Sequence, residues 1–482
     1  MTPPVQPHRH VLVAGAAVSG VAAAEALLRL GAEVTVTDRA ESARTEALAA
    51  LGARVALDLA APPEGVSLVV TSPGWRPDHP LFAAAASAGV EVIGEVELAY
   101  RLADTARTPW LGVTGTNGKT TTVGMLESIL RAAGCRTVAA GNVGLPLIQA
   151  VTAPPGGEPY DVLAVELSSF QLHWTSTVEC LDAAVLNVAE DHVDWHGSMA
   201  AYAADKARIW RGNLCSVYNA EDGWCRRLVA DHVRSYPDDG DAHGFGLGPP
   251  DGGDFGVVDG KLVDAAYGID PDADEWPGRG TVLADVADIP LPGPHNVANA
   301  LAAAALARAY GNSGRAGRRI GAAAVREGLR SFPAGHHRNE LVHTAGGVAY
   351  VDDSKATNPH AATASLSAYD RVVWIAGGLL KGATVDELVR AVRPRLAGVV
   401  LLGRDRHVIS ASIARHAPDV PVAEVARTDD GAMAEVVRAA AALAAPGDTV
   451  LLAPAAASMD MFRDYAARGD AFASAARQLG RQ

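Results

Sequence analysis

The apolar positions of this chain gather into short runs separated by helical stretches, an alternation typical of parallel α/β sheets. In the first segment the pattern predicts a strand over 10–14, a glycine turn over 15–20, a helix over 21–30 and a strand over 33–37. Asp38 closes this βαβ unit. Two more units follow, with a strand over 68–71, and the segment ends near Arg107.

A second α/β segment begins with a strand over 110–114 and a helix that runs to about Arg131. Strands and helices continue to alternate to about Ala203. From about 237 to 280 the chain is rich in Asp, Gly and Pro and its periodicity is weak, so we predict a loop-rich surface excursion with one hairpin. A helix over 297–309 then restores regular structure.

A third α/β segment begins near Phe332 and contains a predicted strand over 349–351. Its apolar runs predict further buried parallel strands over 372–376, 398–402 and 449–453. The chain of 482 residues is long enough for about three domains. We therefore predict an α/β protein with a Rossmann-like domain over 1–107, a P-loop-type ATPase domain with a mainly parallel sheet over 108–332, and a Rossmann-like domain over 333–482.

Composition narrows the class of function. The net charge of −14 argues against broad binding to nucleic acids or anionic membranes. The four cysteines have no CxxC spacing, which favours reduced, mostly buried thiols. No apolar run is long enough to span a bilayer, and the N-terminus lacks the apolar core of a signal peptide. These features predict a soluble, cytoplasmic protein.

A glycine-rich loop, Gly115-Thr116-Asn117-Gly118-Lys119-Thr120, lies between the strand over 110–114 and the following helix. Small residues let backbone N–H groups approach an anion, and the helix N-terminus adds partial positive charge. Lys119 supplies a cation for the β- and γ-phosphates, and the Thr120 hydroxyl can ligate Mg²⁺. Val113 stands where a strict Walker A motif has glycine. The loop predicts an ATP site.

Three polar residues follow this loop at places suited to the same chemistry. Glu166 follows a strand of the same layer, where its carboxylate can hold Mg²⁺ on ATP. His192 lies in the acidic run 190–194 after another strand, which favours a second metal contact or a substrate contact over a solvated surface histidine. Lys206 lies on a predicted helix and would by itself be an ordinary solvated lysine.

The run 114–121 closely resembles the signature of the Mur ligase family, which includes the folylpolyglutamate synthases, and the resemblance covers essentially the whole chain. It implies that Lys206 is carbamylated and holds a second Mg²⁺ with His192. It implies that Asn142, in the loop 141–144, contacts the acceptor substrate, and that Asn299, rather than Asn296, contacts adenine. The residues implied to bind ATP in this segment are Gly115, Thr116, Asn117, Gly118, Lys119, Thr120, Thr121 and Asn299.

In the third segment the run Asp353-Ser354-Lys355-Ala356-Thr357-Asn358 resembles the D-glutamate-adding members of the family. Asp353 and Arg338 are implied to contact ATP, with Arg338 at the γ-phosphate. The residues implied to bind D-glutamate are Thr357, Lys381, Ser458 and Phe462. Two details depart from the family pattern, because Leu379 and Leu380 precede Lys381 where Asp or Asn is usual, and Ala456 replaces a cysteine.

The turn over 15–20 lacks the middle glycine of a dinucleotide fingerprint, since Ala17 stands there, so NAD is a poor match. In the D-glutamate-adding members this domain binds the uridine diphosphate part of the acceptor. By resemblance, that group would be contacted by Val18, Ser19, Asp38, Arg39 and Ser72.

The resemblance implies an ATP-dependent ligase that joins D-glutamate to UDP-N-acetylmuramoyl-L-alanine through an acyl phosphate, with ATP and two Mg²⁺ ions. We expect a monomer whose domains close on the substrates. Lys119, His192, Lys206 and Arg338 would carry the catalysis, and either His192 or a nearby carboxylate would deprotonate the amine. A relative that uses another amino acid or a folate, and a nucleotide sensor without catalysis, are the alternatives.

Overall fold

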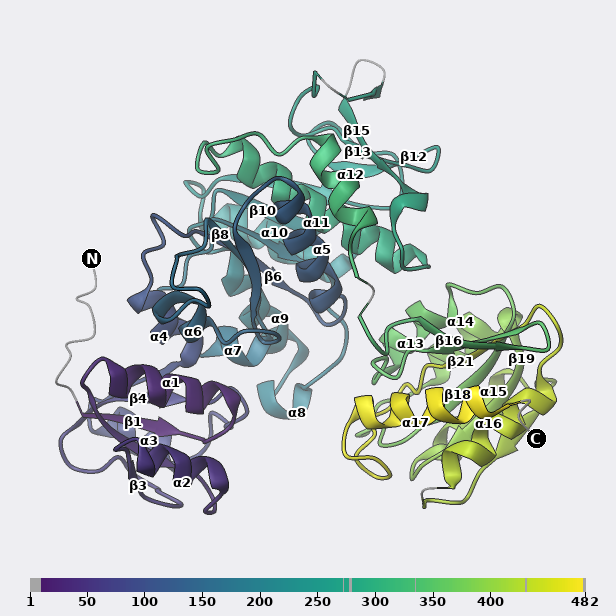
Figure 1. Ribbon diagram of the computed structural model, residues 1–482, viewed down its shortest axis with the longest axis horizontal. Helices are drawn as coiled ribbons and strands as arrows, with labels where there is room; N and C mark the ends of the chain where they lie inside the picture. The colour runs from purple at the N-terminus through teal and green to yellow at the C-terminus, as the bar shows by residue number, and fades with distance from the viewer. Residues whose placement is uncertain (1–9, 272, 277–279, 334, 430, 480–482) are drawn as a thin grey trace. The chain divides into compact units, whose positions relative to one another are not determined.

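The computed structural model describes residues 10–271, 273–276, 280–333, 335–429 and 431–479 (Figure 1). Three mainly parallel sheets carry helices on their faces, which confirms the predicted α/β class. Contacts divide the chain into two compact units. The first comprises the described residues up to Asp288 with Ala298–Phe332, and the second comprises Ile289–Val297 with the described residues from Pro333 onward.

The first sheet is parallel throughout, with the strand order β3-β2-β1-β4-β5. Both of its faces are buried, because alternate residues of β1 enter different clusters. Val11 and Val13 pack with α1, and Leu12 packs with Phe82 of α3. Its elements are β1 (His10–Ala14), α1 (Val18–Arg29), β2 (Glu33–Thr37), α2 (Ala43–Ala50), β3 (Arg54–Val55), β4 (Val66–Thr71), α3 (Pro80–Ser87), β5 (Glu91–Gly94) and α4 (Glu95–Leu102).

Helix α1 begins at Val18, three residues before the predicted start at Val21. Gly15 has a left-handed backbone (φ 98°) and completes the turn by itself. Gly20 is already helical, and it packs against the carbonyl oxygen of Gly15 where a Cβ would collide. The second glycine therefore serves close packing of the helix on the turn, and the prediction that it belongs to the turn was wrong.

The central sheet has ten strands in the order β14-β15-β13-β12-β11-β10-β9-β6-β8-β7. Its parallel part carries the loops after β6, β8 and β9 at one edge, because the carboxyl ends of parallel strands meet there. Its elements to the end of the parallel part are β6 (Trp110–Thr114), α5 (Lys119–Ala132), β7 (Thr137–Gly141), α6 (Leu147–Thr152), β8 (Val162–Glu166), α7 (Ser169–His173), β9 (Asp182–Val185), α8 (Val193–His196), α9 (Met199–Ala207), the 3₁₀ helix η1 (Arg208–Trp210), β10 (Cys215–Asn219), α10 (Gly223–Ser235) and β11 (Asp241–Phe245).

The segment predicted to be a loop-rich excursion extends this sheet instead. The predicted hairpin is present, since β12 and β13 pair antiparallel, and β15 and β14 add two more antiparallel strands. A buried ion pair between Arg308 Nε and Asp264 Oδ2 (2.6 Å) fastens the extension to α11. The remaining elements are β12 (Phe255–Val258), β13 (Lys261–Asp264), β14 (Glu275–Trp276), β15 (Gly280–Asp285), η2 (Val286–Asp288), α11 (Pro294–Asn312) and α12 (Ala322–Arg330).

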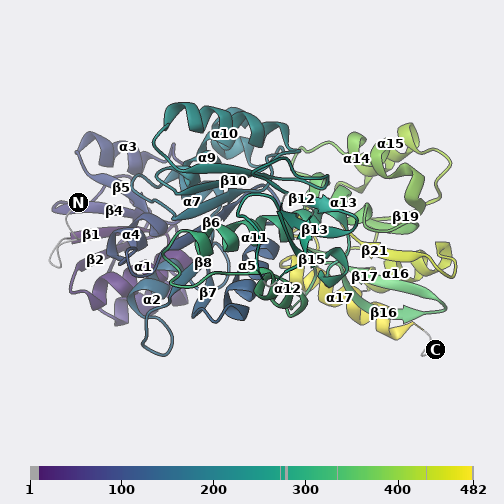
Figure 2. The ribbon, with the colours of Figure 1, turned by 90° about the horizontal axis from the view of Figure 1, so that it is seen from above.

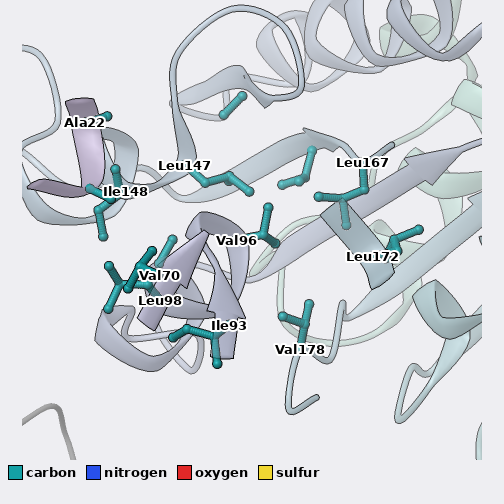
Figure 3. Packing of buried hydrophobic residues seen from close by; sticks show 14 of the residues in the cluster. Ala22, Val70, Ile93, Val96, Leu98, Leu147, Ile148, Leu167, Leu172 and Val178 are labelled. Carbon is teal, nitrogen blue, oxygen red and sulfur yellow. The ribbon is translucent and has the colours of Figure 1, made fainter. Parts of the chain in front are cut away.

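One hydrophobic cluster joins the first sheet to the central sheet (Figure 3). Val70 and Ile93 come from strands of the first sheet, and Leu147 and Ile148 come from α6 beside the central sheet. Helix α6 packs against both α1 and α4. This continuous apolar packing explains why both sheets belong to one compact unit.

The third sheet has the order β16-β17-β21-β18-β19-β20, and all of its pairs are parallel except that of β16 with β17. Helices α14 and α15 cover one face, and α16 and α17 cover the other (Figure 2). The predicted buried strands are confirmed. The elements are β16 (Glu340–Ala345), β17 (Val348–Asp352), α13 (Pro359–Leu366), β18 (Val372–Gly377), α14 (Asp386–Val392), η3 (Arg393–Arg395), β19 (Leu396–Leu402), α15 (Arg406–His416), β20 (Val422–Glu424), α16 (Ala432–Leu443), β21 (Thr449–Leu452) and α17 (Tyr465–Gln478).

Two composition-based predictions can be compared with the structure. The cysteines are all free and buried, as expected: Cys135, Cys180, Cys215 and Cys225. No helix among the described residues combines the length and apolar character needed to cross a bilayer. The domain boundaries at 107 and 332 remain predictions.

Candidate active site

The glycine-rich loop joins β6 to α5 and folds against α11. Gly118 caps α5 in a left-handed conformation (φ 86°), and a Cβ there would collide with the side-chain amide of Asn299. Nζ of Lys119 donates to the carbonyl oxygens of Gly115 (2.9 Å) and Thr116 (3.0 Å). A cation and a helix N-terminus thus meet at one loop, which is the arrangement that binds phosphate. Thr120 and Thr121 lie in the first turn of the helix.

Asn187 holds the phosphate loop from the end of β9. Its side-chain oxygen accepts from the backbone N–H of Asn117 (2.9 Å), and its Nδ2 donates to the carbonyl oxygen of Asn117 (3.0 Å). Its own carbonyl accepts from the N–H of Thr116 (2.9 Å). Sequence reasoning did not select Asn187. Its position directly after a strand of the same sheet was the available signal.

Lys206 reaches the phosphate loop from α9 and is fully buried. Its Nζ donates to the Gly115 carbonyl oxygen (2.8 Å), the same atom that Lys119 contacts. Tyr202 lies beneath it, with the ring centroid 4.5 Å from Nζ and the hydroxyl 3.0 Å from Oγ1 of Thr116. Burial, and then the positive charge of Lys119, lower the pKa of Lys206 well below its ordinary value. A neutral amine is therefore favoured, and a neutral amine is a nucleophile.

Glu166 ends β8 with its side chain buried. Its Oε1 accepts from Nδ2 of Asn142 (2.8 Å), and its backbone carbonyl accepts from the Asn142 N–H (2.9 Å). Its Oε2 is buried without a hydrogen-bond partner among the described residues. A buried carboxylate oxygen in this state has the chemistry of a ligand for a hard cation.

His192 precedes α8 in a left-handed conformation (φ 54°), which is uncommon for a residue with a side chain. Its ring centroid lies 4.6 Å from that of Phe170, and its Nδ1 lies 3.6 Å from Oδ1 of Asp191. The side chain is 41% exposed. The imidazole is therefore oriented by its neighbours and still open to solvent, as a ligand or substrate contact requires.

The proposed acceptor residues gather at the carboxyl edge of the first sheet. Oδ2 of Asp38 accepts from the N–H of Ala16 (2.8 Å), and Oδ1 accepts from the N–H of Arg39 (2.7 Å). Ser72 donates to the carbonyl oxygen of Gly15 (3.2 Å). Val18 and Ser19 open α1, and Val18 is 62% exposed. An open helix N-terminus beside a glycine turn can receive a diphosphate.

In the second unit, Asp353 lies buried just after β17 and accepts from the N–H of Asn339 (3.3 Å). Burial raises the pKa of Asp353 to about 6, and the nearby Arg338 acts in the opposite direction. The strand-to-helix turn is capped by Asn358, whose side chain accepts from the N–H of Ala361 (2.8 Å). Thr357 is half-buried in this turn.

Two further loops of the second unit are joined by backbone hydrogen bonds. Leu379 and Ala457 exchange N–H···O bonds of 2.8 and 2.9 Å. Lys381 stands exposed next to this junction with a left-handed backbone (φ 53°). Ser458 is buried, and its carbonyl oxygen accepts from the N–H of Phe462 (2.9 Å). The loops predicted to bind the amino acid are thus tied to each other within the unit.

Comparison with known proteins places the chain in a family. The model described as Mur ligase middle domain matches residues 113–248, and the model described as Mur ligase, glutamate ligase domain matches residues 337–456. The UDP-N-acetylmuramoylalanine–D-glutamate ligase of Streptomyces coelicolor is 56% identical over 481 residues, covering 98% of each chain. The chain belongs to the Mur ligase family.

Other Mur ligases agree with this placement. The UDP-N-acetylmuramoylalanine–D-glutamate ligase of Thermobifida fusca is 54% identical over 98% of both chains. The crystal structure of UDP-N-acetylmuramate-alanine ligase from Thermotoga maritima covers 98% of this chain and 100% of its own, with a TM-score of 0.56 and 18% identity. That likeness concerns the fold.

A third family model, described as alanine dehydrogenase/PNT, C-terminal domain, matches residues 2–105. This range contains the described part of the first parallel sheet. Ala17 stands at the middle position of the glycine turn, so the turn departs from the dinucleotide fingerprint in this Mur ligase.

Arg468 of α17 is a second residue that sequence reasoning missed. Its guanidinium donates to Oγ of Ser354 (2.9 Å), to the carbonyl oxygen of Ser354 (2.9 Å) and to that of Ala456 (3.0 Å). The side chain is fully buried, and burial lowers its pKa to about 10. Arg468 therefore connects the turn after β17 to the loop after β21. A lone arginine on a helix gives no sequence signal for such a role.

Proposed function

We propose that this Mur ligase uses ATP to join D-glutamate to UDP-N-acetylmuramoyl-L-alanine in the synthesis of peptidoglycan precursors. The observation that carries the proposal is that Nζ of Lys119 and Nζ of Lys206 both contact the Gly115 carbonyl oxygen, in a loop built to bind phosphate. The D-glutamate ligase of Streptomyces coelicolor, at 56% identity along the whole chain, supports the choice of substrates.

The chemistry requires activation of a carboxylate, whose leaving group would otherwise be oxide. The terminal carboxylate of the acceptor attacks the γ-phosphorus of ATP, ADP leaves, and an acyl phosphate forms. The amine of D-glutamate then attacks the acyl carbon, inorganic phosphate leaves, and the amine proton passes to a base. His192 or a neighbouring carboxylate is proposed as that base.

The chain's main contribution is positioning and charge neutralisation. Lys119 and the N–H groups of the loop hold the phosphates of ATP, and Asn299 contacts the adenine. Val18, Ser19, Asp38, Arg39 and Ser72 receive the uridine diphosphate part of the acceptor, and Asn142 contacts it near the reacting end. These assignments follow the family resemblance and the positions of the residues at the two sheet edges.

Divalent metal fits the residues present, because Oε2 of Glu166 is buried without a partner among the described residues. Glu166, Thr120, His192 and a carbamylated Lys206 would hold two Mg²⁺ ions, which would neutralise charge on the transferring phosphoryl group. The neutral amine that burial favours at Lys206 is the form that reacts with CO₂ to give a carbamate.

The second unit supplies the remaining proposed contacts. Arg338 and Asp353 are assigned to ATP, with Arg338 at the γ-phosphate. D-glutamate is assigned to Thr357, Lys381, Ser458 and Phe462. Lys381 offers an exposed cation for a carboxylate of the amino acid, beside the loop that carries Ser458.

Replacement of Lys119 tests the phosphate-loop role. We expect Lys119→Ala to lower phosphate release in the presence of ATP, Mg²⁺ and both substrates by about 100-fold or more, because a preorganised charge at the transferring group is lost. Lys261→Ala is the matched control, since Lys261 pairs with Asp285 on β15 at the sheet extension. Full activity in Lys119→Ala would remove the basis of the proposal.

A further inference from the structure

Three short helices of the first unit each adjoin one proposed cation ligand. Helix α7 starts three residues after Glu166, α8 starts directly after His192, and α9 contains Lys206. The relative placement of these helices therefore sets the relative placement of the three ligands. Neither α7 nor α8 exceeds five residues, so neither holds its position through helix packing alone.

A polar cluster, formed by Ser169, His173, His196 and Asp205 and buried except at the partly exposed His173, connects the three helices. Oδ2 of Asp205 on α9 lies 2.8 Å from Nδ1 of His173 on α7 and 3.0 Å from Nδ1 of His196 on α8. Nε2 of His196 lies 3.0 Å from Oγ of Ser169, at the start of α7. The side chain of His196 is fully buried, and that of Asp205 is 8% exposed.

Ring contacts connect the polar cluster to His192 through Phe170. The rings of His196 and Phe170 are parallel, with centroids 5.5 Å apart. Phe170 then contacts the ring of His192 at 4.6 Å. On α9, Asp205 directly precedes Lys206, whose Nζ reaches the Gly115 carbonyl. Asp205 is thus linked to Lys206 through the backbone, and to the ring of His192 through His196 and Phe170.

The short distances in the cluster are those of hydrogen bonds. Two ligands of a tetrahedral ion bound at about 2.0 Å would lie about 3.3 Å apart, which exceeds both Asp205–histidine separations. The other oxygen of Asp205 accepts from Nε of Arg208 (3.0 Å). The carboxylate is therefore satisfied by three donors, and the hydrogen bonds of the cluster hold the three helices together.

We propose that Asp205, His173, His196 and Ser169 are positioning residues that hold Glu166, His192 and Lys206 in register for the divalent cation of the ATP site. This inference rests on the proposed function, because it requires those three residues to act as cation ligands. Partners behind a metal ligand fix its orientation, and their loss weakens metal affinity about 10-fold to 100-fold.

The test measures direct Mn²⁺ binding by the full chain in the presence of a non-hydrolysable ATP analogue. Electron paramagnetic resonance detects the Mn²⁺ ion. The variants are Asp205→Asn and His196→Phe, of which the second keeps a ring against Phe170 and removes both nitrogens. Asp231→Asn is the matched control, because Asp231 is exposed on α10 and pairs only with Arg234 among the described residues. Melting temperatures identify the variants that fold.

We expect at least one folded variant, with a melting temperature near that of the wild type, to bind Mn²⁺ about 10-fold or more weakly. Activity in that variant should recover as Mg²⁺ is raised, with the KM for D-glutamate unchanged. Wild-type affinity in every folded variant would overturn the inference and leave the proposed function intact. Wild-type protein that binds no Mn²⁺ with the analogue would overturn both the inference and the proposed function. Zn²⁺ that binds to the wild type and not to Asp205→Asn would show that the cluster is a metal site, and would overturn its assignment as a set of positioning residues.

Discussion

Asp182 lies in the middle of the central sheet with neither carboxylate oxygen hydrogen-bonded to a described residue. Its strand, β9, lies between β6 and β10, and the residue is 1% exposed. Burial raises the pKa of Asp182 to about 7. The carboxyl is therefore protonated in the folded chain at a pH where the unfolded chain is ionised.

The contribution of Asp182 to the stability of the protein should fall as the pH rises from about 4 to about 7. Across that window the folded state keeps a proton on Asp182 that the unfolded state releases. This difference lowers the free energy of unfolding by at most about 4 kcal/mol at pH 8. Asp182→Asn should remove this contribution and melt at a higher temperature than the wild type at pH 8. Thermal melts at pH 5 and pH 8 measure this contribution, with Asp238→Asn, at an exposed residue, as the control. An equal pH dependence of the melting temperature in Asp182→Asn and the wild type would contradict the prediction.

Lys206 shows why a buried lysine is a functional signal. Two amines that share one carbonyl oxygen would repel if both were charged, and burial adds to that cost. We expect Lys206→Arg, which cannot form a carbamate, to lose about 100-fold or more of the activity. ¹³C-labelled bicarbonate should give a carbamate resonance in the wild type and none in the variant. Unchanged activity in CO₂-free buffer together with no resonance would rule out the modification.

At the scale of elements, the strands and helices around the phosphate loop could be predicted because each is a local pattern ending in a polar turn. In the extension, the β12–β13 hairpin was predicted because it pairs neighbouring residues. Strands β14 and β15 were not predicted, because β14 has only two residues and β15 pairs with β13 across a long intervening segment. The early start of α1 was hidden for a similar reason, since Gly20 serves tertiary packing against Gly15.

Helix α17 makes a testable contribution through Arg468. Replacement by Met would leave the carbonyl oxygens of Ser354 and Ala456 buried without their donor, so we expect Arg468→Met to lose about 2–4 kcal/mol of unfolding free energy. The KM for D-glutamate should rise as the two loops separate. Arg463→Met, at an arginine that is 86% exposed, is the control in urea unfolding. Equal stability of the two variants would show that Arg468 is dispensable.

At the scale of the molecule, the sequence motifs selected the residues to which the chemistry is assigned and missed the residues that contact and hold them. Lys119 and Lys206, both selected from the motifs, contact the same carbonyl oxygen. Asn187 and Asp205 escaped notice because an anchoring residue is defined by contacts that form only in the folded chain. The hydrophobic core shared by the first two sheets was not predicted for the same reason, because its contacts join residues far apart in the sequence.

The assigned reaction is tested by measuring phosphate release by the full chain with ATP, Mg²⁺, UDP-N-acetylmuramoyl-L-alanine and one amino acid at a time. We predict that D-glutamate raises phosphate release well above the level without an amino acid, and that L-glutamate, L-alanine, L-lysine and diaminopimelate do not. Phosphate release that is the same with D-glutamate as with L-glutamate or with no amino acid would show that the assigned reaction is wrong.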